Sequence, residues 1–242
     1  MYIKNNKAEY KKIDFSYLIL KFKYEIKYLE GYLSFTKDLV NDKGTQLSEE
    51  MYNDTKLAPE NESLILDIFE NEGKSLLCYY HHSAVVLIYS VLETVLSEIC
   101  YEIFTNTSAK FSHDDLSSGS LIGKAKDYLV ITSGLDFSLI SGEWAEIGKY
   151  QNLRNIIVHQ NSFFTKGKKG LKQKTSIKNN FPEIEISNLG DKFYIVKSST
   201  LLRFIRTIEI FIYKILSYVE QVDFLTKYND HPINLLNEDM PF

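Results

Sequence analysis

Apolar residues recur every three or four positions over most of this chain, which is the spacing of an amphipathic α-helix. The pattern predicts a first helix that Asp14 can cap and that runs to about Val40. The period is lost over residues 41–61, where glycine, proline and acidic or amide residues predict a surface loop with room for a short helical turn. We therefore expect residues 1–61 to form a helix and a loop that pack on the body of the protein.

The next helix is predicted to begin near Glu62 and to reach Phe104, with a weak point at Gly73. Its second half carries two adjacent apolar stripes, which imply burial on most sides, and Glu93 sits among small residues between them. The segment from Ala84 to Phe104 is the best candidate for a membrane span, but it contains three glutamates. The pattern therefore favours a buried helix of a soluble bundle, with no membrane as a partner.

Two shorter helices follow a loop at residues 111–120 that is rich in serine, aspartate and glycine. The first is predicted over residues 121–131 and ends at the serine–glycine pair that follows it. Ser141 can cap the second helix, which ends near His159. The stretch 166–178 comes next and contains six lysines, two glycines and no acidic residue. We expect this stretch not to be helical, because it lacks an apolar period.

Alternating apolar and polar residues then predict a β-hairpin with strands at 183–187 and 193–197. A last helix is expected over residues 198–225, where the apolar residues follow the 4-3 spacing of a helix that packs along another helix. The final residues, 226–242, contain two prolines and are expected to be irregular. The expected fold class is therefore all-α, a helical bundle with a small inserted β-hairpin at about 183–197.

Composition agrees with one large helical domain over residues 62–225, because the chain has 242 residues and 44% of them are apolar. The net charge of −4 gives no overall positive field, so any site for a polyanion must be local. Cys78 and Cys100 lie too far apart along one predicted helix to form a disulfide. The first residues also lack the apolar run of a secretory leader. Both features lead us to expect a cytoplasmic protein.

Arg154 and His159 lie five positions apart near the end of one predicted helix. The chain has three arginines against 25 lysines, so the fork-shaped guanidinium has a selective use here. Arginine clamps phosphate oxygens and histidine moves a proton near neutral pH, a combination that suits phosphodiester chemistry. The other histidine groups, at His81, His82 and His113, have no second cluster at ligand spacing. We therefore expect neither a metal nor another cofactor.

On a helical wheel, one narrow polar strip within about 60° is formed by Gly148, Asn152, Asn155 and His159. Asn155 is one turn from His159, so its amide can hold a ring nitrogen and select the tautomer. Arg154 lies roughly 140° from His159 on the same wheel. The two side chains converge if Arg154 reaches around, if the helix frays, or if a second copy supplies the partner group. The last option favours a symmetric dimer.

The segment from Arg154 to His159, Arg-Asn-Ile-Ile-Val-His, resembles the signature of the HEPN superfamily (higher eukaryotes and prokaryotes nucleotide-binding domains). That signature is an arginine, a spacer of about four to six residues and a histidine, with a polar residue usually just after the arginine. The aromatic and apolar residues at every third position from Trp144 to Leu153 are similar to its usual lead-in. Residues 89–96, centred on a glutamate, resemble the long helix that precedes the motif in many members. The resemblance covers roughly residues 62–225.

The resemblance implies an all-helical bundle that dimerises so that two such motifs line one cleft. Many members are metal-independent endoribonucleases of toxin–antitoxin and phage-defence systems, so RNA is the implied substrate and an antitoxin or defence protein an implied partner. By position, Arg154 and His159 would form the catalytic pair, and Asn155 would be the supporting polar residue. Glu93 would orient Arg154, whose apolar surroundings on the wheel also require a counter-charge.

In such a reaction the RNA 2′-hydroxyl attacks the neighbouring phosphate, His159 transfers a proton and Arg154 stabilises the phosphoryl oxygens. The lysines after the motif are expected to follow the RNA backbone, and a solvated loop is the equal alternative. These lysines are Lys166, Lys168, Lys169, Lys172 and Lys174. The alternative function is a catalytically inactive HEPN-like helical module that serves dimerisation, partner binding or nucleotide binding.

Overall fold

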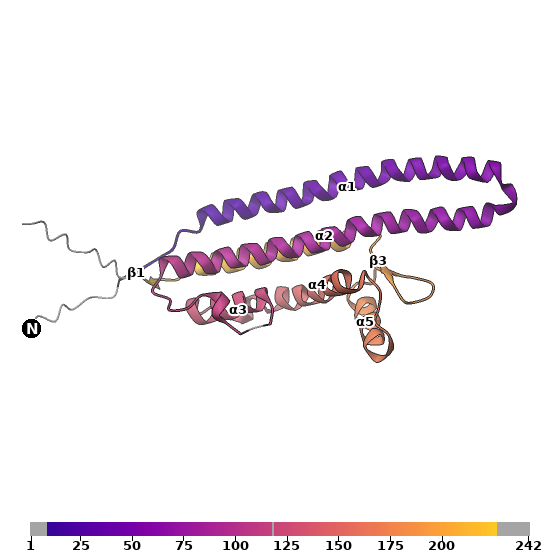
Figure 1. The fold of residues 1–242 in the computed structure, drawn as a ribbon. Coiled ribbons are helices and arrows are strands. Elements are labelled where there is room, and N and C mark those ends of the chain that lie inside the picture. Colours follow the sequence, from indigo (N-terminus) through magenta and orange to yellow (C-terminus); the bar gives the residue numbers. More distant parts are fainter. Residues whose placement is uncertain (1–8, 118, 227–242) are drawn as a thin grey trace, which may run out of the picture.

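The computed structural model of the protein describes residues 9–117 and 119–226. It is 76% helical, which confirms the all-α fold class with a small β insertion (Figure 1). The helices are α1 (Ser16–Leu57), α2 (Glu62–Asn106), α3 (Leu121–Ser133), α4 (Ser141–Gln160), α5 (Gly167–Asn180) and α6 (Ser199–Val219). Short 3-10 turns cover Pro59–Asn61, His113–Asp115 and Phe137–Ile140. The strands are β1 (Tyr10–Lys11), β2 (Glu185–Ile186), β3 (Phe193–Tyr194) and β4 (Phe224–Leu225).

Helices α1 and α2 form a long antiparallel hairpin, and their 42 and 45 residues make them about 63 and 68 Å long. The predicted loop over residues 41–61 is wrong, because α1 continues to Leu57 and one 3-10 turn then leads into α2. Packing between the helices decides this. Leu47 is buried and shares a hollow with Leu66 and Phe69 of α2, although the residues around Leu47 in the sequence are mostly polar.

Helix α2 lies at the centre of the bundle and packs against α1, α3, α4 and α6. Val85, Leu92 and Ile99 are fully buried, in agreement with the predicted apolar stripes. The span Pro59–Asn106 is long and apolar enough to cross a membrane by length and composition alone, and half of its most apolar window is buried inside the protein. The core helix of a bundle shows the same combination of apolar sequence and burial.

Helix α4 begins without the serine cap that the sequence suggested. The chain enters it directly from the 3-10 turn Phe137–Ile140, and Ile140 occupies the cap position. The Ser141 hydroxyl instead donates to the carbonyl oxygen of Ser138 at 3.1 Å. The preceding helix, α3, ends as predicted, with Gly134 in the left-handed region at a φ of 69°.

Residues 166–178 lie largely within α5, so the prediction that they are not helical is wrong. Contacts with the residues just before the helix hold its first turns. A Cβ on Gly170 would lie 1.6 Å from the carbonyl oxygen of Thr165, so only glycine permits this close approach. Gln173 accepts hydrogen bonds from the backbone nitrogen and hydroxyl of Thr165 at 2.9 and 3.0 Å, and Ile177 is buried. A few anchored positions replace the missing apolar stripe.

The predicted β-hairpin is present with shorter strands, in which β2 pairs antiparallel with β3 and Glu185 faces Tyr194. Helix α6 ends at Val219 and not near residue 225. Beyond α6, β4 pairs antiparallel with β1, with Tyr10 opposite Leu225. This pairing brings the two ends of the described chain together and draws the C-terminal segment out of the helix. Most of the predicted irregular tail, residues 227–242, lies outside the described residues.

Candidate functional site on helix α4

Helix α4 is held against α6 by an aromatic contact near its centre. Tyr150 stacks on Phe204, with ring centroids 4.0 Å apart and 7° between the ring planes. The Tyr150 hydroxyl also donates to the carbonyl oxygen of Thr200 at 3.0 Å. Because Ile147 and Leu153 are fully buried as well, the rotation of α4 about its axis is set. This packing therefore fixes which residues of α4 face the solvent.

The predicted polar strip lies on this open face. Asn152, Asn155 and His159 are exposed, and Gly148 is half-buried. His159 occupies the last turn of α4, just before Asn161 ends the helix with a left-handed φ of 47°. The imidazole of His159 is therefore accessible to a ligand from outside and is not enclosed in the core.

Arg154 is half-buried and lies toward α2, where its guanidinium carbon is 5.6 Å from the centre of the Tyr89 ring. Its Nη1 donates to Asn155 Oδ1 at 3.3 Å, so Asn155 contacts the arginine and not, as predicted, the imidazole of His159. The Nε of Arg154 is buried and has no hydrogen-bond partner among the described residues. An arginine donor without a partner gains a hydrogen bond if Arg154 moves to meet an acceptor from outside the chain, such as a phosphate oxygen.

Within the described residues, no hydrogen bond or ion pair joins Arg154 to His159. This agrees with their angular separation on α4, because two residues roughly 140° apart on a helix point to different sides. One α4 helix therefore presents the two groups separately. A shared site requires a movement of Arg154 or a second copy of the chain.

Glu93 lies one turn along α2 from Tyr89 and is close enough to Arg154 for their charges to interact. Burial raises the pKa of the Glu93 carboxyl above its ordinary value, and the positive charge of Arg154 opposes part of this rise. The described residues include no ion pair within 4.0 Å between the two side chains, so the predicted pairing exists only at longer range. Glu93 also lines a surface groove of about 550 Å³ together with Ser90 and Ser97.

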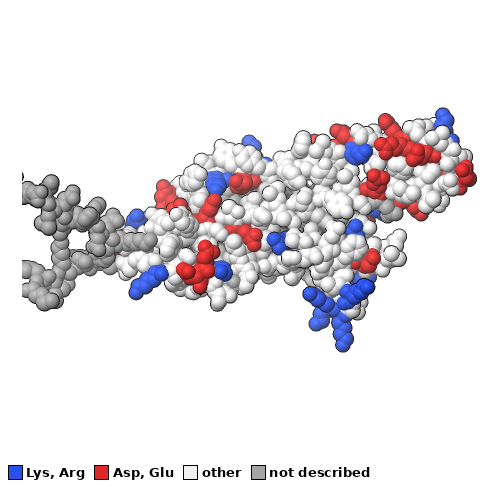
Figure 2. All heavy atoms as spheres, viewed as in Figure 1, with Lys and Arg blue, Asp and Glu red and all other residues white. Residues whose placement is uncertain are grey.

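Helix α5 begins seven residues after the end of α4, which carries the polar strip. The Gln173 amide joins α5 to α4 by donating to Gln160 Oε1 at 3.4 Å. Figure 2 shows the lysines of α5 as a cluster of positive charge that projects from the molecule. The exposed members of the predicted RNA-binding set are Lys166, Lys168, Lys169 and Lys172. Lys174 differs, because it is half-buried and its Nζ donates to the carbonyl oxygen of Gly190 at 3.1 Å.

The N-terminus of α5 adds to this positive potential. Its cap residue, Lys166, makes no side-chain cap, and the first turn contains no acidic residue. A helix dipole places about half a positive charge at the N-terminus, and the neighbouring Lys168 and Lys169 add to this charge. Such an end repels cations and attracts anionic groups, among them phosphates.

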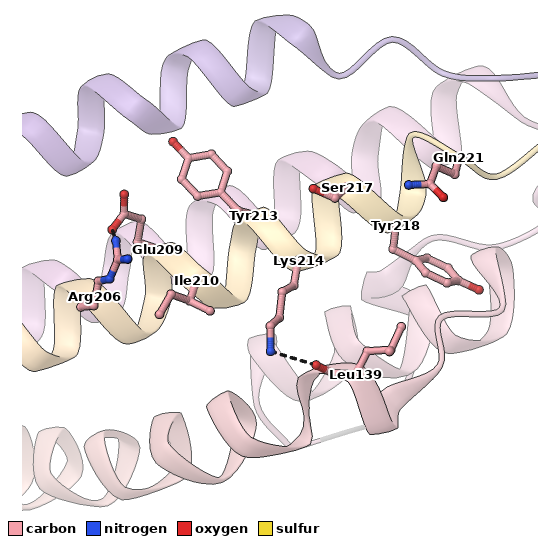
Figure 3. Close-up of a pocket in the computed structure, with 9 residues that line it drawn as sticks. All are labelled: Leu139, Arg206, Glu209, Ile210, Tyr213, Lys214, Ser217, Tyr218 and Gln221. Atoms are coloured by element: carbon pink, nitrogen blue, oxygen red, sulfur yellow. Dashed lines mark hydrogen bonds and ion pairs between the residues drawn. The ribbon is translucent and has the colours of Figure 1, made fainter.

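A pocket of about 680 Å³ lies elsewhere, between α6 and the turn at Leu139 (Figure 3). Its charged side chains are paired within the chain. Arg206 lies 2.6 Å from Glu209, and Lys214 lies 2.8 Å from Glu143 and 3.1 Å from the carbonyl oxygen of Leu139. None of the described histidines lines this pocket. It offers a hollow with satisfied charges, in contrast to the open face of α4.

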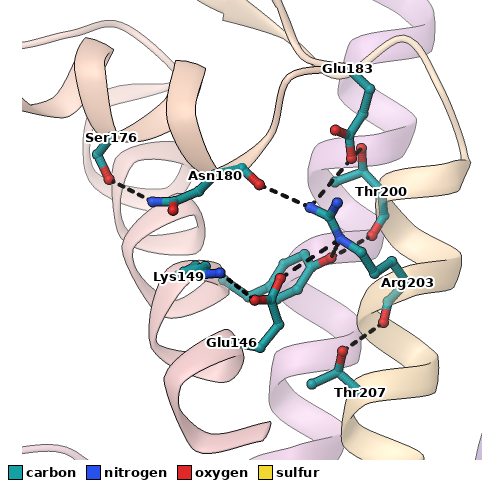
Figure 4. Close-up of polar contacts among 9 residues, drawn as sticks. Glu146, Lys149, Ser176, Asn180, Glu183, Thr200, Arg203 and Thr207 are labelled. Atoms are coloured by element: carbon teal, nitrogen blue, oxygen red, sulfur yellow. Dashed lines mark hydrogen bonds and ion pairs between the residues drawn. The ribbon is translucent and has the colours of Figure 1, made fainter. Parts of the chain in front are cut away.

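Arg203 of α6 is the residue that the sequence pattern did not single out (Figure 4). Its Nε donates to the Tyr150 hydroxyl at 2.9 Å, and its Nη2 donates to the carbonyl oxygen of Asn180 at 3.1 Å. The same guanidinium lies 3.4 Å from Glu183 and 3.8 Å from Glu146. Arg203 thereby ties together α4, α6 and the end of α5. The rarity of arginine was the one sequence signal that pointed to it.

Two histidines of α2 serve packing of the β-hairpin. The Nδ1 of His81 lies 2.6 Å from the carbonyl oxygen of Ile195, and the Nε2 of His82 lies 3.1 Å from Cys78 Sγ. Burial lowers the pKa of His82 to about 4 and raises the pKa of Cys78 to about 11, so both groups are neutral at pH 7. The described residues contain no group of three or more His, Cys, Asp or Glu placed to hold a metal ion.

Comparison of the chain with protein-family models, with curated proteins and with solved structures finds no match. The resemblance to the HEPN superfamily therefore rests on the segment from Arg154 to His159 and its flanking residues, and it stays a prediction.

Proposed function

We propose that this chain is a metal-independent endoribonuclease of HEPN type that acts in the cytoplasm, as a homodimer, in a toxin or phage-defence system. The observation that carries the proposal is the open face of α4. There His159 is exposed, and on the side of α4 that is turned toward α2, Arg154 retains a buried Nε that no group of the described chain accepts from. A proton-transfer group and a phosphate clamp are the two parts that RNA cleavage needs from a protein.

The chemistry requires only groups that the chain and the RNA supply. The RNA 2′-oxygen forms a bond to the adjacent phosphorus, and the bond from phosphorus to the 5′-oxygen breaks. His159 accepts the proton of the 2′-hydroxyl or returns one to the leaving 5′-oxygen, and Arg154 stabilises the negative charge on the phosphoryl oxygens. The products are a 2′,3′-cyclic phosphate and a 5′-hydroxyl. The proposed antitoxin or defence partner would act by controlling access to this face.

The exposed lysines of α5 support the same proposal, because they lie just beyond the C-terminal end of α4. Four ammonium groups there can contact consecutive phosphates of a single strand, and each contact releases counterions. Affinity for single-stranded RNA is expected to fall with salt, with a log–log slope of about −3 for four contacts. Replacing Lys168 and Lys169 by alanine should reduce the size of that slope by about 1 to 1.5.

The direct test is cleavage of total RNA and of a defined single-stranded RNA by purified protein with EDTA present. The wild-type chain, Arg154→Ala and His159→Ala are compared, and Asn152→Ala serves as the control because Asn152 is an exposed neighbour on the same helix. We expect Arg154→Ala and His159→Ala to lose cleavage, and Asn152→Ala to cleave at the wild-type rate. Equal cleavage by all four proteins, or products without a cyclic phosphate, would remove the proposal.

A mixing experiment then locates the two groups. If Arg154 of one copy works with His159 of the other, a heterodimer of the two alanine variants has one intact site and one empty site. Random pairing of equal amounts should recover about a quarter of the wild-type activity. No recovery on mixing would place both groups of a site on one copy, with Arg154 moving to reach the phosphate.

A further inference from the structure

The α1–α2 hairpin extends beyond the rest of the bundle, as Figure 1 shows at the end near the Pro59–Asn61 turn. We call residues 35–74 the hairpin tip. In α2, Cys78 and His82 still contact the β-hairpin through Phe193. The part of α2 between Glu62 and Cys78 is about 24 Å long, at 1.5 Å per residue. The hairpin tip therefore offers a surface long enough to accommodate another helix.

The hairpin tip exposes apolar side chains on a projecting element. Phe35, Leu57 and Leu64 are 62%, 83% and 61% exposed. Between its two helices is a hollow of about 440 Å³, lined among others by Leu47, Met51, Leu66 and Phe69. Gly44 and Gly73 line the same hollow, and a Cβ on either would meet nothing within 4 Å. An exposed apolar surface with an unfilled hollow is typical of a place where a partner binds.

Charge decides what kind of partner fits. The hairpin tip contains ten acidic residues and four lysines, a net charge of −6, although the whole chain carries −4. Figure 2 shows acidic groups gathered at this end of the molecule. A second hairpin tip would bring −6 against −6, which opposes association. The complementary partner is a basic helix with an apolar side chain to place in the hollow.

Helix α5 has these properties. Residues 166–178 carry six lysines and no acid, and Leu171 stands 67% exposed among them. Its 14 residues span about 21 Å, which is close to the length of the hairpin tip. Within one molecule α5 lies on the opposite side of α2 from α1, as Figure 1 shows, and the contacts of Gly170 and Gln173 hold it there. The α5 helix that can reach a hairpin tip is therefore that of another copy.

We propose that the hairpin tip of one copy binds helix α5 of a second copy, with Leu171 in the hollow between Gly44 and Gly73. The lysines of α5 then lie against acidic groups of the hairpin tip, among them Glu49, Glu70 and Glu72. Reciprocal contacts around a two-fold axis use each surface once and close the assembly as a dimer. Neither surface includes Arg154 or His159. The association therefore does not depend on the proposed nuclease function, although RNA and the hairpin tip would compete for the same lysines.

The test measures the mass of the full chain in solution against protein concentration. The monomer mass is 28.1 kDa. At 0.1 M salt the mass should rise with concentration. It should fall again at 1 M salt, where the screening length drops from about 10 Å to about 3 Å. The first variant reverses α5 by Lys168→Glu, Lys169→Glu and Lys172→Glu. The second reverses the hairpin tip by Glu49→Lys, Glu70→Lys and Glu72→Lys.

Each variant alone should lose the salt-sensitive association. Three substitutions take residues 166–178 from a net charge of +6 to 0, or the hairpin tip from −6 to 0, so both contacts of a symmetric dimer lose their attraction. An equal mixture of the two should regain part of it, because the unchanged hairpin tip of the first variant, at −6, then meets the unchanged residues 166–178 of the second, at +6. Leu171→Asp should also weaken association, whereas Leu189→Asp, at another exposed leucine, should not. Circular dichroism confirms that each variant is folded.

A mass that the reversals leave unchanged, or a loss in both that mixing does not restore, would overturn this interface. RNA cleavage is assayed on the same proteins. The variant with Glu49→Lys, Glu70→Lys and Glu72→Lys keeps the lysines of α5 that are proposed to bind RNA. If this variant cleaves RNA while the interface test fails, the interface alone is refuted. Intact charge-dependent association together with no cleavage by the wild-type chain would refute the nuclease function alone.

Discussion

Arg203 and Arg154 both lie over tyrosine rings, yet their surroundings differ. The guanidinium carbon of Arg203 is 5.9 Å from the Tyr150 ring, and its nitrogens reach that hydroxyl, a backbone carbonyl and two carboxylates. The guanidinium of Arg154 is 5.6 Å from the Tyr89 ring and donates to one amide, and its buried Nε has no partner in the described chain. Arg203 has used its donors to join helices. Arg154 keeps a donor that no group in the described part of the chain accepts from.

The carboxylate near Arg154 leads to the same distinction. Burial raises the pKa of Glu93 more than the charge of Arg154 lowers it. Glu93 is therefore only partly compensated by Arg154, and the guanidinium is not held in a tight ion pair. The contrast is tested by measuring RNA cleavage and the free energy of unfolding for variants of each arginine.

The largest expected effect is on catalysis. Arg154→Ala should reduce the initial rate of RNA cleavage by at least about 100-fold, because a donor aimed at developing charge is lost. Its unfolding free energy should change by less than about 1 kcal/mol, since the side chain makes one side-chain hydrogen bond. Rates and urea midpoints are measured together. A large loss of stability with unchanged specific activity would make Arg154 a second structural arginine.

The converse is expected for Arg203→Met. The Tyr150 hydroxyl, the Asn180 carbonyl and Glu183 lose a shared donor, which should lower the unfolding free energy by about 2 kcal/mol. Cleavage per folded molecule should stay near the wild-type value. Arg206→Met is the matched control, because its ion pair with Glu209 is exposed and should contribute less than about 0.5 kcal/mol. Equal urea curves for both variants would contradict the assignment.

Gly170→Ala tests how the start of α5 is held in place. Alanine normally favours a helix interior over glycine by about 1 kcal/mol, but here the new Cβ would clash with the Thr165 carbonyl. The first turn of α5 should lose protection from amide exchange, while its last turn stays held by Arg203 through Asn180. RNA binding should weaken by roughly threefold, or about 0.7 kcal/mol. Thr175→Ala, at an exposed site on α5, should leave both unchanged.

The smallest effect concerns the titration of Glu93. A carboxyl whose pKa is raised in the folded state makes that state relatively more stable at low pH, and this contribution is lost as pH rises through the folded pKa. Glu93→Gln should therefore raise stability slightly near neutral pH and remove this pH dependence. Arg154→Ala should raise the Glu93 pKa further, which a carbon-13 NMR titration would report. An unchanged pKa in that variant would show that Arg154 does not act on Glu93.

Much of the fold followed from periodicity. The second helix begins at Glu62 as predicted, the end of the third at Gly134 is as predicted, and the β-hairpin lies between residues 183 and 197. These elements have either a continuous apolar stripe or a strong local turn residue. The exposure of His159 could also be predicted, because the polar strip on α4 lies opposite the apolar residues Tyr150, Leu153 and Ile157, which are buried.

The extension of α1 to Leu57 and the whole of α5 could not be read from the pattern. Both depend on residues that are distant in the sequence: Leu47 shares a hollow with Phe69, and α5 is bonded through Lys174 to Gly190 and through Asn180 to Arg203. The network of Arg203 had no local signal either, because its partners come from α4, α5 and the segment before β2.

The amino-acid sequence by itself determined that this chain is a helical bundle and that a histidine and amides share one face of α4, because helical periodicity is a local property. The tertiary structure alone decided that Asn155 contacts Arg154, that Arg154 lies over Tyr89, and that α5 is a docked basic helix. These outcomes depend on which surfaces meet in space, and the spacing of residues along one segment carries no record of that.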